Sequence, residues 1–186
     1  NIEKVTAFLR NKGCGERETL SLVKTHDGKA YYTDGDNNCW RMYDFIEDSI
    51  CLELPESNED FYQCAVAFGK FQRFLDDFPV NELYDTIPDF HNTPKRYADF
   101  IAAVEKDALG RAKNVSAEIE FIKARKDFYS VLLDNEKRGA LPLRVSHNDT
   151  KSNNVMLDKA TRKALCVIDL DTVMPGYSVT DFGDSI

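Results

Sequence analysis

The first 46 residues combine a helical pattern with a strand-like one. Apolar side chains recur every three or four positions in residues 2–9, and a polar Asn-Lys-Gly sequence follows, which predicts a short helix. Three strand-like runs come next, at 19–25, 29–33 and 39–46. Turn sequences that contain Asp-Gly separate these runs, so the pattern predicts an antiparallel three-stranded meander.

The middle of the chain has a helical pattern. Beginning at Ser57, a residue suited to cap a helix, an apolar side chain recurs every third or fourth position until Pro79. A proline ends a helix because it lacks a backbone donor. Two further helices are predicted, over residues 96–105 and 116–138, and Gly139 ends the second.

The last quarter has a hairpin pattern. Two short apolar runs, 155–157 and 164–168, are separated by a polar segment, which predicts a β-hairpin. The elements together predict an α+β chain with two lobes. Residues 1–48 would form a partial N-lobe of helix and antiparallel strands, and residues 49–186 a mostly helical C-lobe that carries the hairpin.

Charge and cysteine content narrow the class of protein. The chain has 24 Lys and Arg against 32 Asp and Glu, a formal net charge of −8, so we expect no nucleic-acid partner and no anionic membrane surface. No apolar run approaches the roughly 20 residues of a membrane span. The five cysteines include no Cys-x-x-Cys pair, which argues against a disulfide framework and favours a cytoplasmic location.

The residues best suited to chemistry lie between the last helix and the end of the hairpin. His147 begins a His-x-Asp-x-x-x-x-Asn sequence. Phosphoryl transfer to a hydroxyl group needs a carboxylate beside the nucleophile, oxygen ligands for Mg²⁺ and a cation near the transferred phosphate. The sequence offers Asp149 for the substrate proton, Lys151 for the γ-phosphate of ATP, and Asn154 and Asp169 as Mg²⁺ ligands at the two ends of the hairpin.

An isolated motif of three fixed letters also fits a structural role. Asp149 could cap a turn, and Asn154 could occupy a β-turn. The strand, turn, strand and aspartate that follow are independent of those letters, and they favour the catalytic interpretation.

These motifs resemble a known family. Residues 145–186 resemble the aminoglycoside phosphotransferase and choline kinase superfamily. The sequences His-Asn-Asp-Thr-Lys-Ser-Asn-Asn and Ile-Asp-Leu-Asp-Thr-Val-Met-Pro-Gly resemble its N-acetylhexosamine 1-kinase branch, as does Asp-Phe-Gly-Asp-Ser-Ile at 181–186. Weaker similarity extends over residues 40–47 and 90–97.

The resemblance implies a protein-kinase-like two-lobe fold and transfer from ATP to the anomeric hydroxyl of an N-acetylhexosamine. Asp149 would be the catalytic base, with Asn154 and Asp169 holding Mg²⁺. The adenine-binding hinge would be the backbone of Asp44, Phe45 and Ile46.

Three residues are expected to organise the catalytic loop. His147 would order the loop rather than take part in the chemistry. The triplet Asp-Phe-Gly at 181–183 spells the magnesium motif of protein kinases, but Asp169 already occupies the position after the hairpin. Asp181 and Asp184 are therefore interpreted as carboxylates that brace the loop by hydrogen bonds.

Three other residues are candidates for substrate contacts. His91 and Arg96 could contact a sugar, or could equally cap and solvate the helix that follows them. Asp171 could contact a second Mg²⁺ or the sugar, and a surface or helix-capping role is an equal alternative.

One departure from the kinase pattern leaves alternatives open. No Gly-rich loop and strand lysine precede the first helix, and the chain stops soon after residue 181, so we expect a fragment of a kinase, truncated at both ends. Its exposed lobe surface could self-associate. The alternatives are a related kinase of choline, homoserine or an aminoglycoside, and a non-catalytic binding or oligomerising fragment.

Overall fold

The first element of the computed structural model, which describes residues 1–185, is the helix α1, Ile2–Asn11. The predicted helix is confirmed, and it buries Val5 and Leu9 on one face. Gly13 adopts a φ of +93°, a conformation that favours glycine, and the Cys14 N–H donates to the Leu9 carbonyl at 3.1 Å. The chain can therefore reverse direction directly after the helix.

The three predicted strand-like runs pair only over short pieces, and the order of these pairings differs from that of the predicted meander. β1 (Tyr32–Thr33) pairs with β2 (Cys39–Trp40), and a single bridge joins Leu22 to Tyr43. The third predicted run thus pairs with both others, but over far fewer residues than the pattern predicts. Both strands are solvent-exposed, so few cross-strand apolar contacts hold longer strands together.

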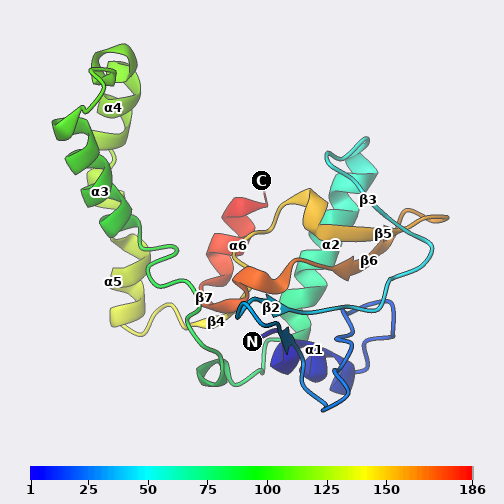
Figure 1. Ribbon diagram of the computed structural model, residues 1–186. Coiled ribbons are helices and arrows are strands. Elements are labelled where there is room, and N and C mark those ends of the chain that lie inside the picture. Colours follow the sequence, from blue (N-terminus) through cyan, green and yellow to red (C-terminus); the bar gives the residue numbers. More distant parts are fainter. Residues whose placement is uncertain (186) are drawn as a thin grey trace. The chain divides into compact units, whose positions relative to one another are not determined.

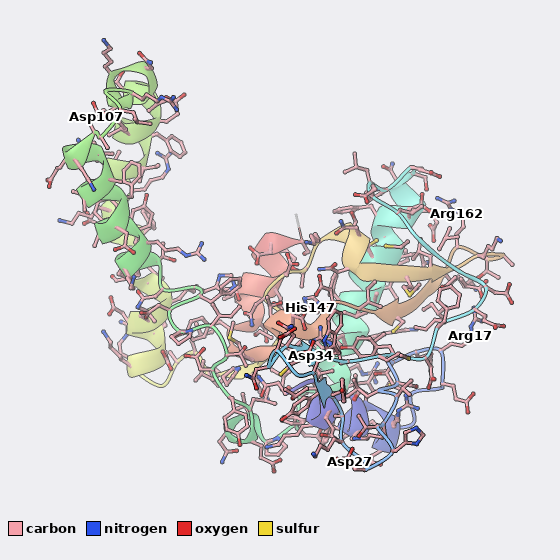
Figure 2. The ribbon with its side chains drawn as sticks, viewed as in Figure 1. Arg17, Asp27, Asp34, Asp107, His147 and Arg162 are labelled. Carbon is pink, nitrogen blue, oxygen red and sulfur yellow. The ribbon has the colours of Figure 1, made fainter. Side chains whose placement is uncertain are left out.

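The turn between β1 and β2 is organised by Asp34 (Figure 2). Its carboxylate accepts hydrogen bonds from the Asn38 N–H at 2.9 Å and from Trp40 Nε1 at 2.8 Å, among others. These bonds, that from Trp40 foremost, lower the pKa of Asp34 to about 2. The turn is therefore built on an ionised carboxylate.

The predicted hairpin is confirmed and belongs to a three-stranded sheet. β5 (Val155–Asp158) pairs antiparallel with β6 (Ala164–Val167) and, on its other side, with β3 (Ser49–Cys51). A second antiparallel pair joins β4 (Arg144–Ser146) to β7 (Met174–Gly176). The helix α6 (Ser178–Asp184) follows β7.

The helix α2, Asn58–Phe74, lies against β5 and β6 (Figure 1). Ser57 caps it as predicted, since its hydroxyl accepts a hydrogen bond from the Asp60 N–H at 3.1 Å. The helix ends earlier than the predicted boundary at Pro79. A 3₁₀ turn, Val80–Glu82, follows that proline.

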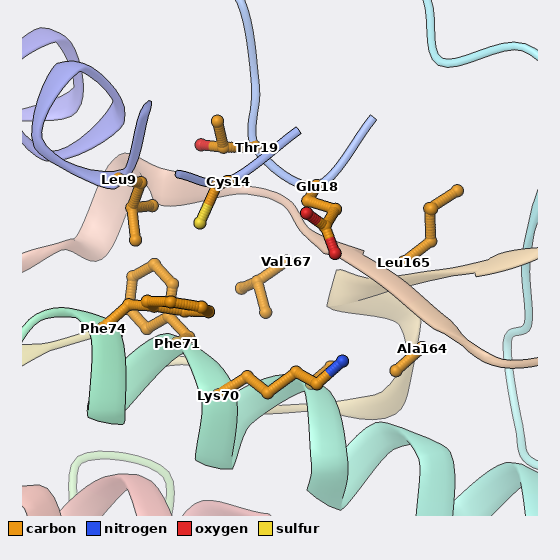
Figure 3. Close-up of a pocket in the computed structure, with 11 residues that line it drawn as sticks. Leu9, Cys14, Glu18, Thr19, Lys70, Phe71, Phe74, Ala164, Leu165 and Val167 are labelled. Carbon is orange, nitrogen blue, oxygen red and sulfur yellow. The ribbon is translucent and has the colours of Figure 1, made fainter. Parts of the chain in front are cut away.

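A hydrophobic core joins α1, α2 and the hairpin. Its largest fully buried apolar side chains are Leu75, Leu157, Leu170, Val5, Val155 and Val173. Figure 3 shows a pocket at the edge of this core, where Phe71 and Phe74 of α2 lie beneath Cys14, and Lys70 and Glu18 add charge.

Residues 87–142 form a compact unit of their own, distinct from the unit that holds residues 1–86 and the stretch from residue 143 onward. Its first helix, α3 (Thr93–Lys106), is capped by Asn92, whose side chain accepts from the Lys95 N–H at 3.0 Å. A 3₁₀ turn, Ala112–Val115, precedes the next helix. The predicted lobe boundary after residue 48 remains a prediction.

The single helix predicted over residues 116–138 is wrong. The segment is divided into α4 (Ser116–Lys123), a 3₁₀ turn (Lys126–Phe128) and α5 (Val131–Lys137). Side chains satisfy carbonyl groups at the break: the Tyr129 hydroxyl donates to the Ile122 carbonyl at 2.7 Å. Phe128, at this break, is exposed.

The elements confirm the predicted α+β class, with helices and small antiparallel sheets in a kinase-like arrangement. No helix in the described residues 1–185 has the length and apolar content to cross a lipid bilayer. Ile186, the last residue of the 181–186 motif, lies outside the described residues.

Two glycines should respond oppositely to alanine. A Cβ on Gly176 would lie 2.8 Å from Ser146 Cβ and 2.9 Å from Asn148 Oδ1, so Gly176→Ala should destabilise the protein by about 1–3 kcal/mol. Gly69, within α2, has open space at this position, so Gly69→Ala should stabilise by about 0.5–1 kcal/mol. Urea unfolding measures both, and equal changes would contradict the packing at Gly176.

The Asp34 turn should open at acid pH. Because the pKa of Asp34 is lowered from 3.8 to about 2, its stabilising bonds are complete above pH 4 and are lost as the pH falls towards 2. Trp40, the chain's one tryptophan, reports this through its fluorescence emission. Asp34→Asn should remove the transition, and a transition of the same size in that variant would assign it to another group.

Candidate active site

The loop from His147 to Lys151 lies between β4 and a 3₁₀ turn, Ser152–Asn154, that leads into β5. β6 returns to the base of the hairpin, where Asp169 adopts a left-handed conformation (φ +56°, ψ +57°). A second 3₁₀ turn, Leu170–Thr172, then leads into β7. The topology therefore places both ends of the hairpin beside the loop.

His147 is completely buried at the centre of the loop. The Asp149 N–H points at its Nδ1 at 3.3 Å, so this nitrogen is the acceptor. The proton then lies on Nε2, which donates to the Ile168 carbonyl at 2.9 Å. Phe68 and Phe71 of α2 meet the ring edge-on, with centroids 5.4 and 5.9 Å away. A neutral imidazole thus ties the loop to the end of β6.

Asp181, in the first turn of α6, accepts hydrogen bonds from the loop backbone. Its two carboxylate oxygens accept from the N–H groups of His147 (2.9 Å) and Asn148 (2.8 Å), and its own carbonyl accepts from the Thr150 hydroxyl at 2.5 Å. The Asp181 side chain is buried, and Gln72 of α2 donates to it at 3.2 Å. Such bonds suit a residue that braces the loop.

Asn148 and Thr172 connect the loop to the turn after Asp169. Asn148 has a φ of +66°, and its Nδ2 donates to the Thr172 carbonyl at 2.9 Å. The Thr172 hydroxyl donates to the His147 carbonyl at 2.6 Å. Sequence reasoning missed both Thr172 and Gln72. The one available signal was Gln72, a polar residue beside the apolar face of α2.

Asp149 lies within hydrogen-bonding distance of two other predicted site residues. Lys151 Nζ is 3.0 Å from Asp149 Oδ2, and Asn154 Nδ2 donates to the same oxygen at 2.9 Å. Asn154 Nδ2 also donates to the Asp149 backbone carbonyl at 2.8 Å. The bond to Asp149 raises the pKa of Lys151, so the lysine is a cation at neutral pH. The Asp149 side chain is about one-third exposed (35%), which a substrate can reach.

Asp169 is exposed and lies directly after Ile168, the residue that closes the base of the hairpin. The Ile168 N–H donates to the Asn154 carbonyl at 2.9 Å, and the Ile168 carbonyl accepts from His147. The residue before Asp169 is therefore bonded to Asn154 and to His147. The negative charge of Asp169 also contributes to the raised pKa of Lys151.

The role of Asn154 and Asp169 as Mg²⁺ ligands stays a prediction, with which the oxygen chemistry of the two side chains is compatible. Both hydrogens of the Asn154 amide point at Asp149, which leaves the amide oxygen for a cation. Within residues 1–185 no group of three or more His, Cys, Asp or Glu is placed to hold a metal by itself. Mg²⁺ commonly takes one or two protein oxygens and completes its shell with phosphate oxygens and water.

The predicted hinge residues line a separate pocket together with Arg10 and Arg17. Phe45 is 81% exposed, whereas Ile46 is buried. The Asp44 N–H donates to the Ser21 carbonyl at 2.9 Å, and the Ile46 carbonyl accepts from the Ser49 hydroxyl at 2.6 Å. The hinge role stays a prediction.

Asp171 is paired with Arg41, a residue that sequence reasoning missed in this role. The Arg41 guanidinium also lies 5.6 Å from the centroid of the Tyr43 ring. This ion pair joins the segment between β2 and the predicted hinge to the turn after Asp169. An interaction with a second Mg²⁺ or with a sugar would compete with it.

The other predicted residues, His91, Arg96 and Asp184, have local surroundings of their own. His91 and Arg96 belong to the unit of residues 87–142, where the Arg96 guanidinium donates to the Phe90 carbonyl and lies over the Phe90 ring. Asp184 is exposed at the end of α6. The roles of these three residues stay predictions.

A comparison with protein families finds a match. A family model described as "Phosphotransferase enzyme family" matches residues 8–186, which is almost the whole chain. The matched segment contains the loop, the hairpin and the turn that carries Asp169.

Asp181→Asn should destabilise the protein by about 2–4 kcal/mol. An amide has only one acceptor oxygen, so it cannot accept from the N–H groups of both His147 and Asn148, and one of these buried donors is left unpaired. Amide exchange at His147 and Asn148 should accelerate more than exchange in α1. The matched control is Asp77→Asn, which changes an exposed carboxylate paired with Lys12. Equal effects of the two substitutions would mean that Asp181 does not brace the loop.

Proposed function

The chain belongs to the phosphotransferase enzyme family and is a kinase-type enzyme, and we propose that it transfers the γ-phosphoryl group of ATP, with Mg²⁺, to a hydroxyl group of an N-acetylhexosamine. The observation that carries this proposal is the cluster at Asp149, where the Lys151 cation and the Asn154 amide both lie within 3.0 Å of one carboxylate oxygen, Asp149 Oδ2.

Asp149 is the general base of this proposal. The bonds from Lys151 and Asn154 both go to Oδ2, so Oδ1 remains available to accept the proton of a substrate hydroxyl. The Asp149 backbone is held by the bond from its own N–H to His147 and by the bond from Asn154 to its carbonyl. The carboxylate is thus oriented before the substrate arrives.

Lys151 supplies positive charge where the transferred phosphoryl group would develop negative charge. Its side chain is about half exposed (52%), so it can leave Asp149 and contact a phosphate oxygen. Asn154 and Asp169 would hold Mg²⁺, which screens the phosphate charges when bound.

The nucleotide would lie along the predicted hinge. The Asp44 N–H and the Ile46 carbonyl are bonded within the protein, so adenine would use the backbone between them. Ile46 is followed closely by β3, which pairs directly with β5 through Ser49↔Asp158. One sheet would therefore connect the adenine site with the strand that follows Asn154.

The acceptor is proposed from the resemblance of residues 147–154 and 168–176 to N-acetylhexosamine 1-kinases. The product would be the sugar 1-phosphate. Asp149 would take the proton of the anomeric hydroxyl, whose oxygen attacks the γ-phosphorus, and ADP would leave.

Phosphorus NMR of the full chain with ATP, Mg²⁺ and a panel of N-acetylhexosamines tests the proposal. We expect a new anomeric phosphate resonance that needs both the sugar and Mg²⁺. Asp149→Asn should lower kcat by about 10²–10⁴-fold and change the KM for ATP by less than about twofold, because the base acts in the chemical step and not in nucleotide binding.

Asp77→Asn, an exposed substitution of the same kind, should leave kcat unchanged. Phosphorylation of choline, homoserine or an aminoglycoside, with no sugar product, would replace the acceptor and keep the transfer chemistry. Absence of Mg²⁺-dependent transfer to every acceptor would refute the proposed function.

A further inference from the structure

The two proposed metal ligands depend on the register of one hairpin. Asn154 directly precedes β5, and Asp169 lies two residues after the end of β6. A slip of one residue between the strands would change the spacing of the ligands and turn side chains to the opposite face. Whatever holds the register therefore also holds the metal pair.

The hairpin contains a bulge, so backbone pairing fixes its strand register less strictly than it fixes the register of a regular hairpin. Met156 pairs with Cys166, but Leu157 pairs with Ala164, so Leu165 is an extra residue on β6. Bulges of this kind accommodate one unpaired residue and bend the strand. The pairing alone allows the extra residue to shift along β6.

Arg162, in the turn of the hairpin, fixes the far end of both strands. It has a φ of +55°, and its guanidinium binds Asp60 of α2 through two bonds of 2.8 Å, Nε to Oδ1 and Nη2 to Oδ2. Nη2 also donates to Glu56 at 2.9 Å. Two parallel bonds to one carboxylate set the direction of the side chain as well as its distance.

Asp60 is a rigid partner because it is buried and also bonded to the backbone just before its own helix. It is only 1% exposed, and its carboxylate accepts from the Glu56 N–H at 3.2 Å. The bonds from Arg162 are the main cause of a strongly lowered pKa of Asp60. A second contact from α2 lies one turn further on, where Gln63 accepts from the Ala164 N–H at 2.9 Å, directly beside the bulge.

The opposite side of the turn is held by Arg17. Its guanidinium donates to the Glu47 and Asp48 carbonyls, both at 3.0 Å, and to the Asp158 carboxylate at 3.2 Å. Figure 2 shows Arg17 and Arg162 near the outer end of the hairpin, away from His147. This end is bonded to the segment after the predicted hinge as well as to α2.

From these contacts we infer that Arg162 is a positioning residue for phosphoryl transfer: by binding Asp60 it sets the register of the hairpin and so the spacing of Asn154 and Asp169. The inference rests on the proposed function only in treating Asn154 and Asp169 as Mg²⁺ ligands. Arg162 itself touches neither substrate nor phosphate.

The experiment compares Arg162→Ala and Arg162→Lys with wild type in the full chain. Arg162→Ala should raise the Mg²⁺ concentration for half-maximal transfer by about tenfold, the usual effect of losing a partner that orients a metal ligand. Arg162→Lys keeps the charge but loses the paired bonds, so its shift should be in the same direction and smaller. Arg162→Lys carries the test where Arg162→Ala does not fold.

A direct readout does not need activity. The bond from the Ile168 amide to Asn154 closes the base of the hairpin. This amide should exchange its hydrogen about tenfold faster in the Arg162 variants than in wild type. The exchange rate of the Val5 amide in α1 should change only as much as the free energy of global unfolding requires. Wild-type protein without transfer activity would refute the proposed function, and the Ile168 amide would still decide the role of Arg162.

Two controls separate positioning from stability and charge. Leu75→Val weakens the core without contact to the hairpin turn, and Lys12→Ala removes an exposed ion pair with Asp77. Neither should change the Mg²⁺ requirement by more than about twofold. Two outcomes overturn the inference. In the first, Leu75→Val lowers Tm as much as the Arg162 variants do and shifts the Mg²⁺ requirement and the exchange rate of the Ile168 amide equally far. In the second, folded Arg162 variants change neither quantity.

Discussion

The buried carboxylate of Asp181 is the interaction on which the catalytic loop depends. Two consecutive backbone N–H groups, of His147 and Asn148, point into the protein and need acceptors there, because water does not reach them. One ionised carboxylate satisfies both, and its own position is supported by Gln72 of α2. Charge-assisted bonds of this kind are stronger and more directional than bonds between neutral groups. The loop therefore has one well-defined conformation before any ligand binds.

From this anchor the order spreads to the two proposed metal ligands by a short series of bonds. His147, once fixed, binds the Ile168 carbonyl, and the Ile168 N–H binds the Asn154 carbonyl. Asn154 in turn orients Asp149. The two bonds of Ile168 link segments that are distant in sequence, so Asp149, Asn154 and the residue before Asp169 are positioned as one unit. Rigid support of this kind reduces the reorganisation that phosphoryl transfer would otherwise require.

The hairpin receives its support at the opposite end. Arg162 and Arg17 bind the turn from two sides, and both interactions use partners in other elements. The base of the hairpin is thus ordered by the Asp181 loop, and its turn by two arginines. A bulge between these two ends is tolerated because neither end depends on the strand pairing alone.

The sequence alone determined the local elements and the positions of the chemical groups. The periodicity of apolar residues in α1 and α2 and the polar segment between two apolar runs predicted those helices and the hairpin, since these signals depend on near neighbours. The spacing from His147 to Asn154 likewise placed the candidate base and ligand on one loop. The sequence predicted that Asp181 braces the loop, but tertiary structure decided which loop N–H groups it binds. Tertiary structure alone paired Arg41 with Asp171 and Arg162 with Asp60. It also decided the break between α4 and α5, where side chains satisfy the carbonyls that a continuous helix would have used. The two pairings of arginine with aspartate depend on contacts between residues distant in the chain, which no local pattern encodes.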